Sequence, residues 1–366
     1  MHDDSSLFSV ERTTCDSLGA AVSRTVLTQV QHALPLCERP YASLGEACGL
    51  SEGEAYCVVE SLRSEGIVRR IGASFESSRL GYASTLVALA VASDEIERVA
   101  ALVGEYAGVT HSYERDNRYN LWFTFIARGV LERDAELKRI VAATGCDDCL
   151  VLPARRLFKI NVAFDVAETS VGGDLARAAA KPASAYAPLE PSGIVAEELD
   201  AADRALVRAL QGDLAGTLRP FARAAQVASE YANRTLGETW AIDRTRSLLE
   251  TGVARRFGAM VRHRRMGFAG NAMGVWDVPD DKVLSAGAVL AAPLLVSHCY
   301  ERPRCVTWPY NLYTMIHGYD RASCQRMASE LHFNLGQEGI SVRPPRLLYS
   351  TREFKKTSMR YFEEDQ

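Results

Sequence analysis

No stretch of this sequence approaches the ~18 uninterrupted apolar residues that a membrane-spanning helix needs. The first residues, MHDDSSLFSVERTT, lack the basic and apolar regions of a secretory signal. We therefore expect a cytoplasmic protein that does not bind a membrane. The nine cysteines are an odd number without the spacing of a disulfide framework, so reduced thiols are the better interpretation.

Motifs of several enzyme classes are missing as well. There is no glycine-rich phosphate loop, zincin helix motif or serine elbow. Cys146 and Cys149 have the spacing of a metal or redox pair, but no second pair follows nearby, so we expect no metal site. The net charge of -4 excludes a surface wholly adapted to nucleic acid but allows a local basic pocket.

The most informative feature that is present is an internal repeat. Glu65-Gly-Ile-Val-Arg-Arg-Ile-Gly-Ala73 reappears as Thr251-Gly-Val-Ala-Arg-Arg-Phe-Gly-Ala259. Thr110-His-Ser-Tyr-Glu-Arg115 likewise reappears as Ser297-His-Cys-Tyr-Glu-Arg302. Collinear matches of this kind indicate two homologous units in one chain of 366 residues.

Each unit has the pattern of three short helices, a β-rich segment and then a β-α-β-β-α-β order. This predicts the α+β class, with two tandem copies of a winged helix-turn-helix followed by a ferredoxin-like domain. The expected divisions are a disordered tail (1–20), the first winged helix-turn-helix (21–78) and ferredoxin-like domain (79–166), a linker (167–193), and the second pair of domains (194–265 and 266–366).

The second repeated motif indicates chemistry on a sheet face. Strand alternation predicts that four side chains share one face, namely Val109, His111, Tyr113 and Arg115, with His298, Tyr300 and Arg302 on the equivalent face of the second copy. Imidazole, phenol and guanidinium groups are poor core material, because each needs a partner when buried. They indicate a pocket, or else satisfied polar groups between two pseudo-symmetric sheets.

Positive charge is concentrated in the second wing. No acidic residue occurs from Thr251 to Trp276, a segment that contains Arg255, Arg256, Arg262, His263, Arg264 and Arg265. Guanidinium groups pair with carboxylate or phosphate, so a polyanion is the expected ligand, and nucleic acid and a polycarboxylate both qualify. The predicted recognition helix argues against DNA, because it carries Glu52, Glu54 and Glu60 against Arg63 alone.

The order of these domains resembles the Lrp/AsnC family of transcription regulators. Several strings are closer to one enzymatic branch, the siroheme decarboxylases, and these include Arg69-Arg-Ile-Gly72, Gly108-Val-Thr-His-Ser-Tyr-Glu-Arg115, Trp308-Pro-Tyr-Asn-Leu312 and Tyr349-Ser-Thr-Arg-Glu-Phe-Lys-Lys356. Two homologous subunits of that family would here be fused, which gives an intramolecular pseudo-dimer. Further assembly into a homo-oligomer stays open.

The resemblance implies loss of carbon dioxide from two acetate side chains of siroheme, which gives 12,18-didecarboxysiroheme in heme biosynthesis. Siroheme and didecarboxysiroheme are then the expected partners, without nucleic acid. No cofactor is expected beyond the iron of the siroheme substrate. Two alternatives remain, a DNA-binding regulator of the Lrp/AsnC type and a non-catalytic tetrapyrrole carrier.

Site residues follow from this hypothesis. The expected proton donors or iron-proximal groups are His263 and His298, with His111, Tyr113 and Tyr300 as further catalytic candidates. The expected substrate-binding residues are Arg69, Arg70, Arg115, Arg255, Arg256, Arg262, Arg302, Arg352, Lys355, Lys356, Trp308 and Tyr310. Because the first wing lacks the basic cluster of the second, we prefer one working site, biased toward the second unit.

Overall fold

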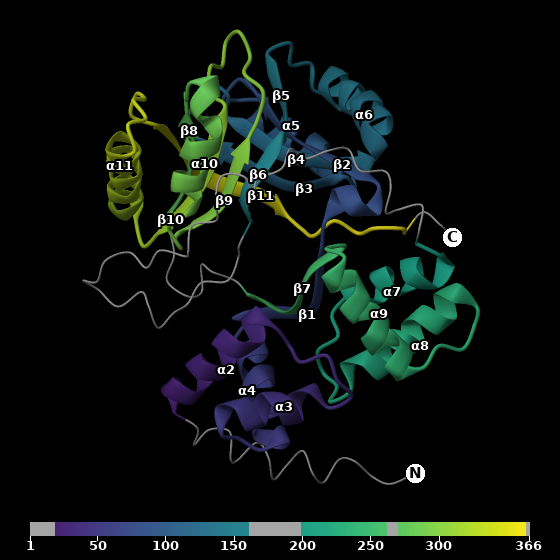
Figure 1. Ribbon diagram of the computed structural model, residues 1–366. Helices are drawn as coiled ribbons and strands as arrows, with labels where there is room; N and C mark the ends of the chain where they lie inside the picture. Colours follow the sequence, from purple (N-terminus) through teal and green to yellow (C-terminus); the bar gives the residue numbers. More distant parts are fainter. Residues whose placement is uncertain (1–18, 161–198, 262–269, 364–366) are drawn as a thin grey trace.

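A computed structural model describes residues 19–160, 199–261 and 270–363 (Figure 1). The expected linker at 167–193 and most of the expected tail at 1–20 lie outside these ranges. Two three-helix units, each followed by a strand, form one half of the molecule (Figure 1). Their elements are α2 (Ala20–His32), α3 (Pro40–Cys48), α4 (Glu52–Ser64) and β1 (Val68–Phe75), then α7 (Ala201–Gln211), α8 (Pro220–Ala232), α9 (Glu238–Glu250) and β7 (Ala254–Val261).

The other half consists of two β-α-β-β-α-β units, so the predicted α+β class with two tandem copies is confirmed. The first unit comprises β2 (Tyr82–Leu89), α5 (Ile96–Glu105), β3 (Val109–Arg115), β4 (Leu121–Arg128), α6 (Gly129–Thr144), β5 (Cys149–Pro153) and β6 (Arg156–Ile160). The second comprises β8 (Gly270–Trp276), α10 (Val283–Ala291), β9 (Val296–Glu301), β10 (Leu312–Gly318), α11 (Arg321–Gln337) and β11 (Arg346–Lys356).

The two units exchange their final strands. The sheet has the order β5-β2-β4-β3-β11-β8-β10-β9-β6. The start of β11 pairs with β8 of its own unit and its end pairs with β3 of the other unit. Likewise β5 pairs with β2, whereas β6 pairs with β9. Only Ala154 and Arg155 separate β5 from β6, the two ends of the sheet, so the sheet closes on itself as a barrel.

The two wings also pair with each other. β1 and β7 form an antiparallel ribbon that lies between the helices and the barrel (Figure 1). Each wing packs on the first helix of the other copy, and the contact is so close that only glycine fits. A Cβ atom at Gly72 would lie 2.6 Å from the carbonyl oxygen of Leu210, and one at Gly258 would lie 2.6 Å from that of Val30. This close approach explains the repeated glycine of the wing motif.

The core has a helical part and a barrel part. Both helical units share one continuous core. In the barrel, α5 and α6 cover the outer face of the first unit and α10 and α11 that of the second. The inner face has a third cluster, built by both units around Trp122, Trp308 and Tyr313. Of the described helices, none combines the length and the apolar character needed to span a membrane.

The segment after β11 connects the two halves of the molecule. The Thr357 amide donates to the Thr110 carbonyl of β3 (2.8 Å). The buried Tyr361 then exchanges backbone hydrogen bonds with the Gln211 side chain, and the amide of the buried Phe362 donates to the Tyr82 hydroxyl (2.9 Å). The chain end therefore attaches the barrel to the helical half.

Candidate active site

Six residues predicted to be functional lie on two equivalent strands of the barrel. Tyr113 pairs in register with Trp122, and Tyr300 pairs with Tyr313, and both partners belong to the inner cluster. Alternation then places the neighbouring residues of each set on the same inner face. These sets are His111, Tyr113 and Arg115 on β3, and His298, Tyr300 and Arg302 on β9.

One detail of the predicted face is wrong. Val109 lies in the outer cluster with α5 rather than beside His111. The reason is an irregularity in the pairing of β3 with β4, in which Val109 pairs with Phe125 and His111 with Thr124. Thr110 is the extra residue of this bulge, and an extra residue reverses the alternation on one side of it.

The two arginines of these sets are held by carbonyl groups of the exchanged strands. The Arg115 guanidinium donates to the Leu348 carbonyl of β11 (2.9 Å), and Arg302 donates to the Leu152 carbonyl of β5. Arg302 lies over the Tyr300 ring at 4.9 Å, and Arg115 lies over the Tyr113 ring at 5.6 Å. The Nε atom of each arginine is buried without a hydrogen-bond partner in the described part of the chain. Burial lowers the pKa of Arg115 to about 10.

The two histidines stack along their neighbouring tyrosines and bind hydroxyl groups. The ring centroids are 6.3 Å apart for His111 and Tyr113 and 6.2 Å apart for His298 and Tyr300. His111 Nδ1 lies 3.0 Å from Thr110 Oγ1. Burial, and then the charges of Lys356 and Arg69, lower the pKa of His111 to about 4, so its imidazole is neutral near pH 7.

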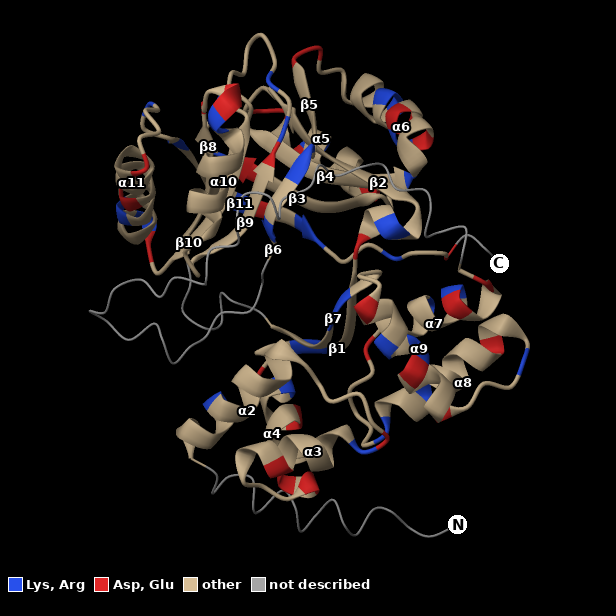
Figure 2. Ribbon diagram, in the orientation of Figure 1, with Lys and Arg blue, Asp and Glu red and all other residues tan. Residues whose placement is uncertain are grey.

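The wings contribute one arginine to each set. Figure 2 shows basic segments on β1 and β7, the ribbon beside the barrel. Arg255 of β7 binds Glu76 (Nε–Oε2, 3.0 Å). Burial raises the pKa of Tyr300, and the charges of Arg255 and Arg302 oppose this rise. In the other copy, Arg69 lies near enough to lower the pKa of His111.

The adjacent wing arginines, Arg70 and Arg256, are directed elsewhere. Arg256 donates to the carbonyl groups of Gln31 and Ala259, and Arg70 donates to those of Gly212 (3.2 Å) and Ala73 (3.1 Å). Both therefore connect a wing to the helices of the other copy, although the sequence suggested that they bind substrate. Arg262 and His263 lie outside the described residues.

The cations of β11 are mostly occupied on the outer side of the sheet. Arg352 binds Glu114 and Glu97, and Lys355 donates to the carbonyl groups of Gly104 (2.7 Å) and Tyr106 (3.0 Å) at the end of α5. Lys356 pairs in register with His111 and contributes to lowering its pKa. Of the three basic residues predicted here, the structure brings only Lys356 close to a histidine of the site.

The two predicted aromatic residues belong to the interior of the barrel. Trp308 is buried, and its indole donates to the Tyr313 hydroxyl (2.9 Å). Its ring contacts that of Tyr310 edge to face at 4.8 Å. These side chains support the inner face on which the histidine, tyrosine and arginine sets lie.

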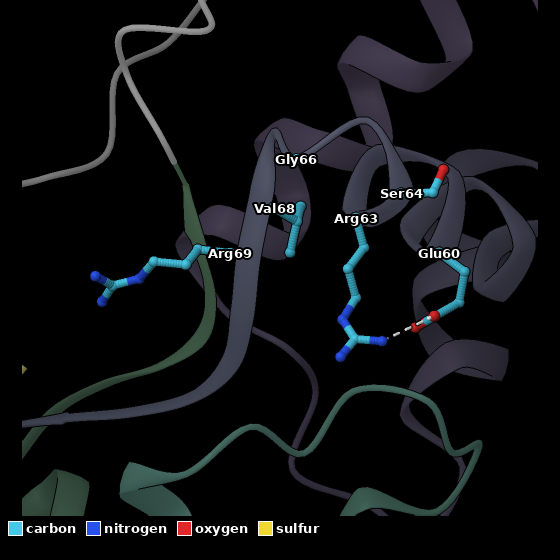
Figure 3. Close-up of a pocket in the computed structure, with 6 residues that line it drawn as sticks. All are labelled: Glu60, Arg63, Ser64, Gly66, Val68 and Arg69. Atoms are coloured by element: carbon cyan, nitrogen blue, oxygen red, sulfur yellow. Dashed lines mark hydrogen bonds and ion pairs between the residues drawn. The ribbon is translucent and has the colours of Figure 1, made fainter. Parts of the chain in front are cut away.

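A surface cavity of 360 Å³ lies beside α4 and β1 (Figure 3). Arg63 and Glu60 point toward each other there, whereas Arg69 points to the other side of β1 (Figure 3). Arg63 also binds Asp213 (2.6 Å). Since two carboxylates neutralise Arg63, this cavity is a poor site for a polyanion. Asp277, Pro279 and Arg304 line a second cavity of 360 Å³, together with residues 341–343.

Three residues beside the site were not predicted from the sequence. Glu76 binds Arg255, and Ser297 links His298 to His317 through hydrogen bonds of 2.7 Å each. A hydroxyl residue precedes the histidine in both copies of the second repeat, which was the available signal for Ser297. Nothing comparable marked Glu76 or His317, because both depend on contacts between strands.

Comparison with known protein families gives matches along most of the chain. Residues 79–159 and 265–355 match the AsnC-like ligand binding domain, and residues 23–69 match the siroheme decarboxylase NirDL-like HTH domain. A crystal structure of the siroheme decarboxylase NirDL, in complex with an iron-uroporphyrin III analogue, is similar with a TM-score of 0.66. The two are 29% identical, over 93% of this chain and 94% of that one.

Relatives of similar length agree with this match. A siroheme decarboxylase of Hydrogenobacter thermophilus is 34% identical over 342 residues, which cover 93% of this chain and 95% of the relative. The siroheme decarboxylase NirDL subunit of Paracoccus denitrificans is 37% identical over 333 residues, or 90% of this chain and 94% of the relative. With its two copies in one polypeptide, the chain belongs to the siroheme decarboxylase family.

Proposed function

We propose that this protein removes carbon dioxide from two acetate side chains of siroheme, those on pyrrole rings C and D. Methyl groups remain, and the product is 12,18-didecarboxysiroheme. The observation that carries the proposal is the pair of equivalent histidine, tyrosine and arginine sets on the inner barrel face, each with a wing arginine nearby. The complex of the related NirDL protein with an iron-porphyrin analogue supports a tetrapyrrole as the ligand.

Charge supports a polycarboxylate ligand. Siroheme is a flat macrocycle with eight carboxylates, so its site needs several cations beside an apolar surface. Arg115 and Arg302 each keep a buried Nε atom without a partner in the described part of the chain, and neither pairs with a carboxylate there. Buried cations favour an anion nearby. Arg69, Arg255 and Lys356 add positive charge close to the same histidines and tyrosines.

The reaction needs few protein groups. The bond between the acetate methylene and its carboxylate breaks, and carbon dioxide leaves. The electron pair stays on the methylene carbon and delocalises into the macrocycle until a proton is added. No cofactor beyond the iron of the substrate is proposed. The protein has to hold the substrate carboxylates, keep water away from the reacting group and deliver one proton per acetate.

Within this proposal, arginines hold carboxylates and a histidine or tyrosine delivers the proton. His111 and His298 are the first candidates, with Tyr113 and Tyr300 beside them. The pKa of His111 is low in the protein without bound substrate. Negative charge raises the pKa of a nearby imidazole, so binding of the polycarboxylate makes His111 a better proton donor. Arg262 and His263 remain proposed members of the second unit's set, toward which we expect the working site to be biased.

Anaerobic incubation with siroheme followed by mass spectrometry tests the proposal. The expected result is conversion to a product that has lost two molecules of carbon dioxide, with strongly reduced conversion by His298→Ala or His111→Ala. Stoichiometric binding of siroheme with an unchanged mass would instead indicate a carrier. A DNA gel shift that weakens steeply with salt, without conversion, would indicate a regulator.

A further inference from the structure

The second unit contains a hydrogen-bonded chain of three side chains behind its site. Ser297 Oγ lies 2.7 Å from His298 Nδ1 and 2.7 Å from His317 Nε2. Ser297 is 1% exposed, and the two imidazoles are partly buried. A hydroxyl group both donates and accepts, so it can connect two imidazole nitrogens.

A β-bulge creates this arrangement. His298 pairs in register with Met315 and Val296 pairs with Ile316, so Ser297 is the extra residue on β9. A bulge re-aims a side chain that regular alternation would send to the opposite face. The backbone of β10 takes part as well, because the His317 amide donates to the Leu295 carbonyl (2.9 Å). The distance between the two histidines is therefore set by the pairing of these strands.

The surroundings of His317 include a buried amide oxygen. Asn271 lies across from His317 on β8, and its Oδ1 atom is buried without a hydrogen-bond partner in the described part of the chain. Ile160 pairs in register with His298 from β6. None of the residues that pair in register with the two histidines is acidic, so these positions place no carboxylate against the imidazoles.

The first unit lacks the second histidine. Its own bulge residue, Thr110, contacts His111 in the same way as Ser297 contacts His298. The position of His317 on β10 corresponds to Ile126 on β4, because both follow the repeated Tyr-Asn-Leu motif at the same distance. Ile126 is buried in the core that the helical units share. Within the described residues, the second unit thus has a polar route from its active-site histidine to a second imidazole, and the first unit has an aliphatic side chain at that position.

We infer that His317 and Ser297 form a proton relay that supplies His298, a role that rests on the proposed decarboxylation. His298 gives its Nε2 proton to the methylene carbon from which carbon dioxide has left. Its Nδ1 atom takes the Ser297 hydroxyl proton, and Ser297 takes the Nε2 proton of a cationic His317. One proton enters the product, His298 is left as the other neutral tautomer, and His317 becomes neutral. His317 and Ser297 are positioning residues that act through His298.

The test compares Ser297→Ala, Ser297→Thr and His317→Ala. Proton transfer by a positioned side chain contributes roughly 100- to 10,000-fold to reaction rates. Because loss of the relay removes only part of this rate enhancement, we expect kcat to fall roughly 10- to 100-fold in Ser297→Ala and His317→Ala. Siroheme affinity, measured by absorbance titration, should stay within about twofold of the unmodified protein, because the relay does not contact carboxylates. Ser297→Thr keeps the hydroxyl group, and threonine occupies this bulge in the first unit, so it should retain most of the activity.

Added imidazole should restore turnover in His317→Ala, an effect that a purely structural role would not produce. His332→Gln is the matched control, since His332 lies on α11, outside the barrel, and its ring binds the Val342 carbonyl (2.9 Å). Full kcat in both relay variants would overturn the inference, as would a loss of siroheme affinity that matches the loss of turnover. Failure of the unmodified protein to convert siroheme would instead refute the proposed function itself.

Discussion

Replacing two adjacent arginines of the second wing by methionine should have different effects. The Arg255 variant should bind siroheme more weakly, and the Arg256 variant should be less stable. Arg255 and Arg256 share a repeated motif, and both were expected to bind substrate. In the structure Arg255 binds Glu76 and lies near Tyr300, whereas Arg256 donates to the carbonyl groups of Gln31 and Ala259. Successive residues of a strand point to opposite faces, which is why neighbours have different partners.

For Arg255→Met we expect weaker siroheme binding with little loss of stability. A charge-assisted hydrogen bond to a substrate carboxylate contributes about 1.5–3 kcal/mol, which corresponds to a roughly 10- to 150-fold increase in Kd. The ion pair with Glu76 is partly exposed, with 29% and 19% of the two side chains accessible. A pair of this kind contributes at most about 1 kcal/mol to the free energy of unfolding.

For Arg256→Met the expectation is reversed. The substitution leaves the Gln31 and Ala259 carbonyls without their donor, at about 1–3 kcal/mol for each buried group. Burial lowers the pKa of Arg256, so removing its charge recovers part of that cost. We expect the free energy of unfolding to fall by about 2 kcal/mol, while the folded variant binds siroheme like the unmodified protein.

Urea unfolding and absorbance titration with siroheme measure the two quantities separately. The titration is repeated at low and high salt. Because salt screens charges, the difference in siroheme affinity between Arg255→Met and the unmodified protein should be smaller at high salt. Normal affinity in Arg255→Met together with a large loss of stability would refute the assignment of Arg255 to the site. Weakened binding in a fully stable Arg256→Met would refute the structural role of its neighbour.

Three further outcomes are expected. Burial lowers the pKa of His111 from 6.5 to about 4, so the unfolded chain takes up a proton at a higher pH than the folded chain does. The free energy of unfolding therefore falls by at most about 3 kcal/mol as the pH falls through this range. In urea unfolding between pH 7 and 4, His111→Phe should lose less stability than the unmodified protein. Glu76→Gln should tighten siroheme binding several-fold at low salt and not at high salt, because it removes a negative charge that competes for Arg255. Tyr361→Ala should lower the free energy of unfolding by about 3–5 kcal/mol, because the buried Tyr361 ring packs against Phe75 and Tyr82. An unchanged midpoint of urea unfolding would contradict this packing role.

Local elements of the fold could be read from the sequence because short-range rules determine them. The capping box of α4 is such an element, because Ser51 and Glu54 lie three residues apart and exchange their hydrogen bonds. The repeat also revealed which strands are equivalent, and this placed the histidine and tyrosine of each set on one face. These predictions needed only spacing, alternation and the comparison of one copy with the other.

The exchange of strands could not be read in the same way. The β-α-β-β-α-β order predicts one final strand after the second helix of each unit, but two strands follow α6, β5 and β6, and they pair with different units. Periodicity shows that a segment is extended, and it carries no information about the strand beside it. The roles of Arg115 and Arg302 depend on this exchange, since the carbonyl group that each binds belongs to the other unit's final strand.

The two β-bulges could not be predicted from the sequence either, so the faces of the residues beside them were uncertain. One extra residue on β3 or β9 moves a side chain to the other face, and the pattern of Val109 to Arg115 does not reveal it. The result is a hydroxyl group beside each histidine, in both copies. The copies then diverge on the neighbouring strand, where one has Ile126 and the other His317. A symmetric homodimer would carry the same residue at both positions, whereas two copies of different sequence allow a polar relay behind one histidine and a packed aliphatic side chain behind the other.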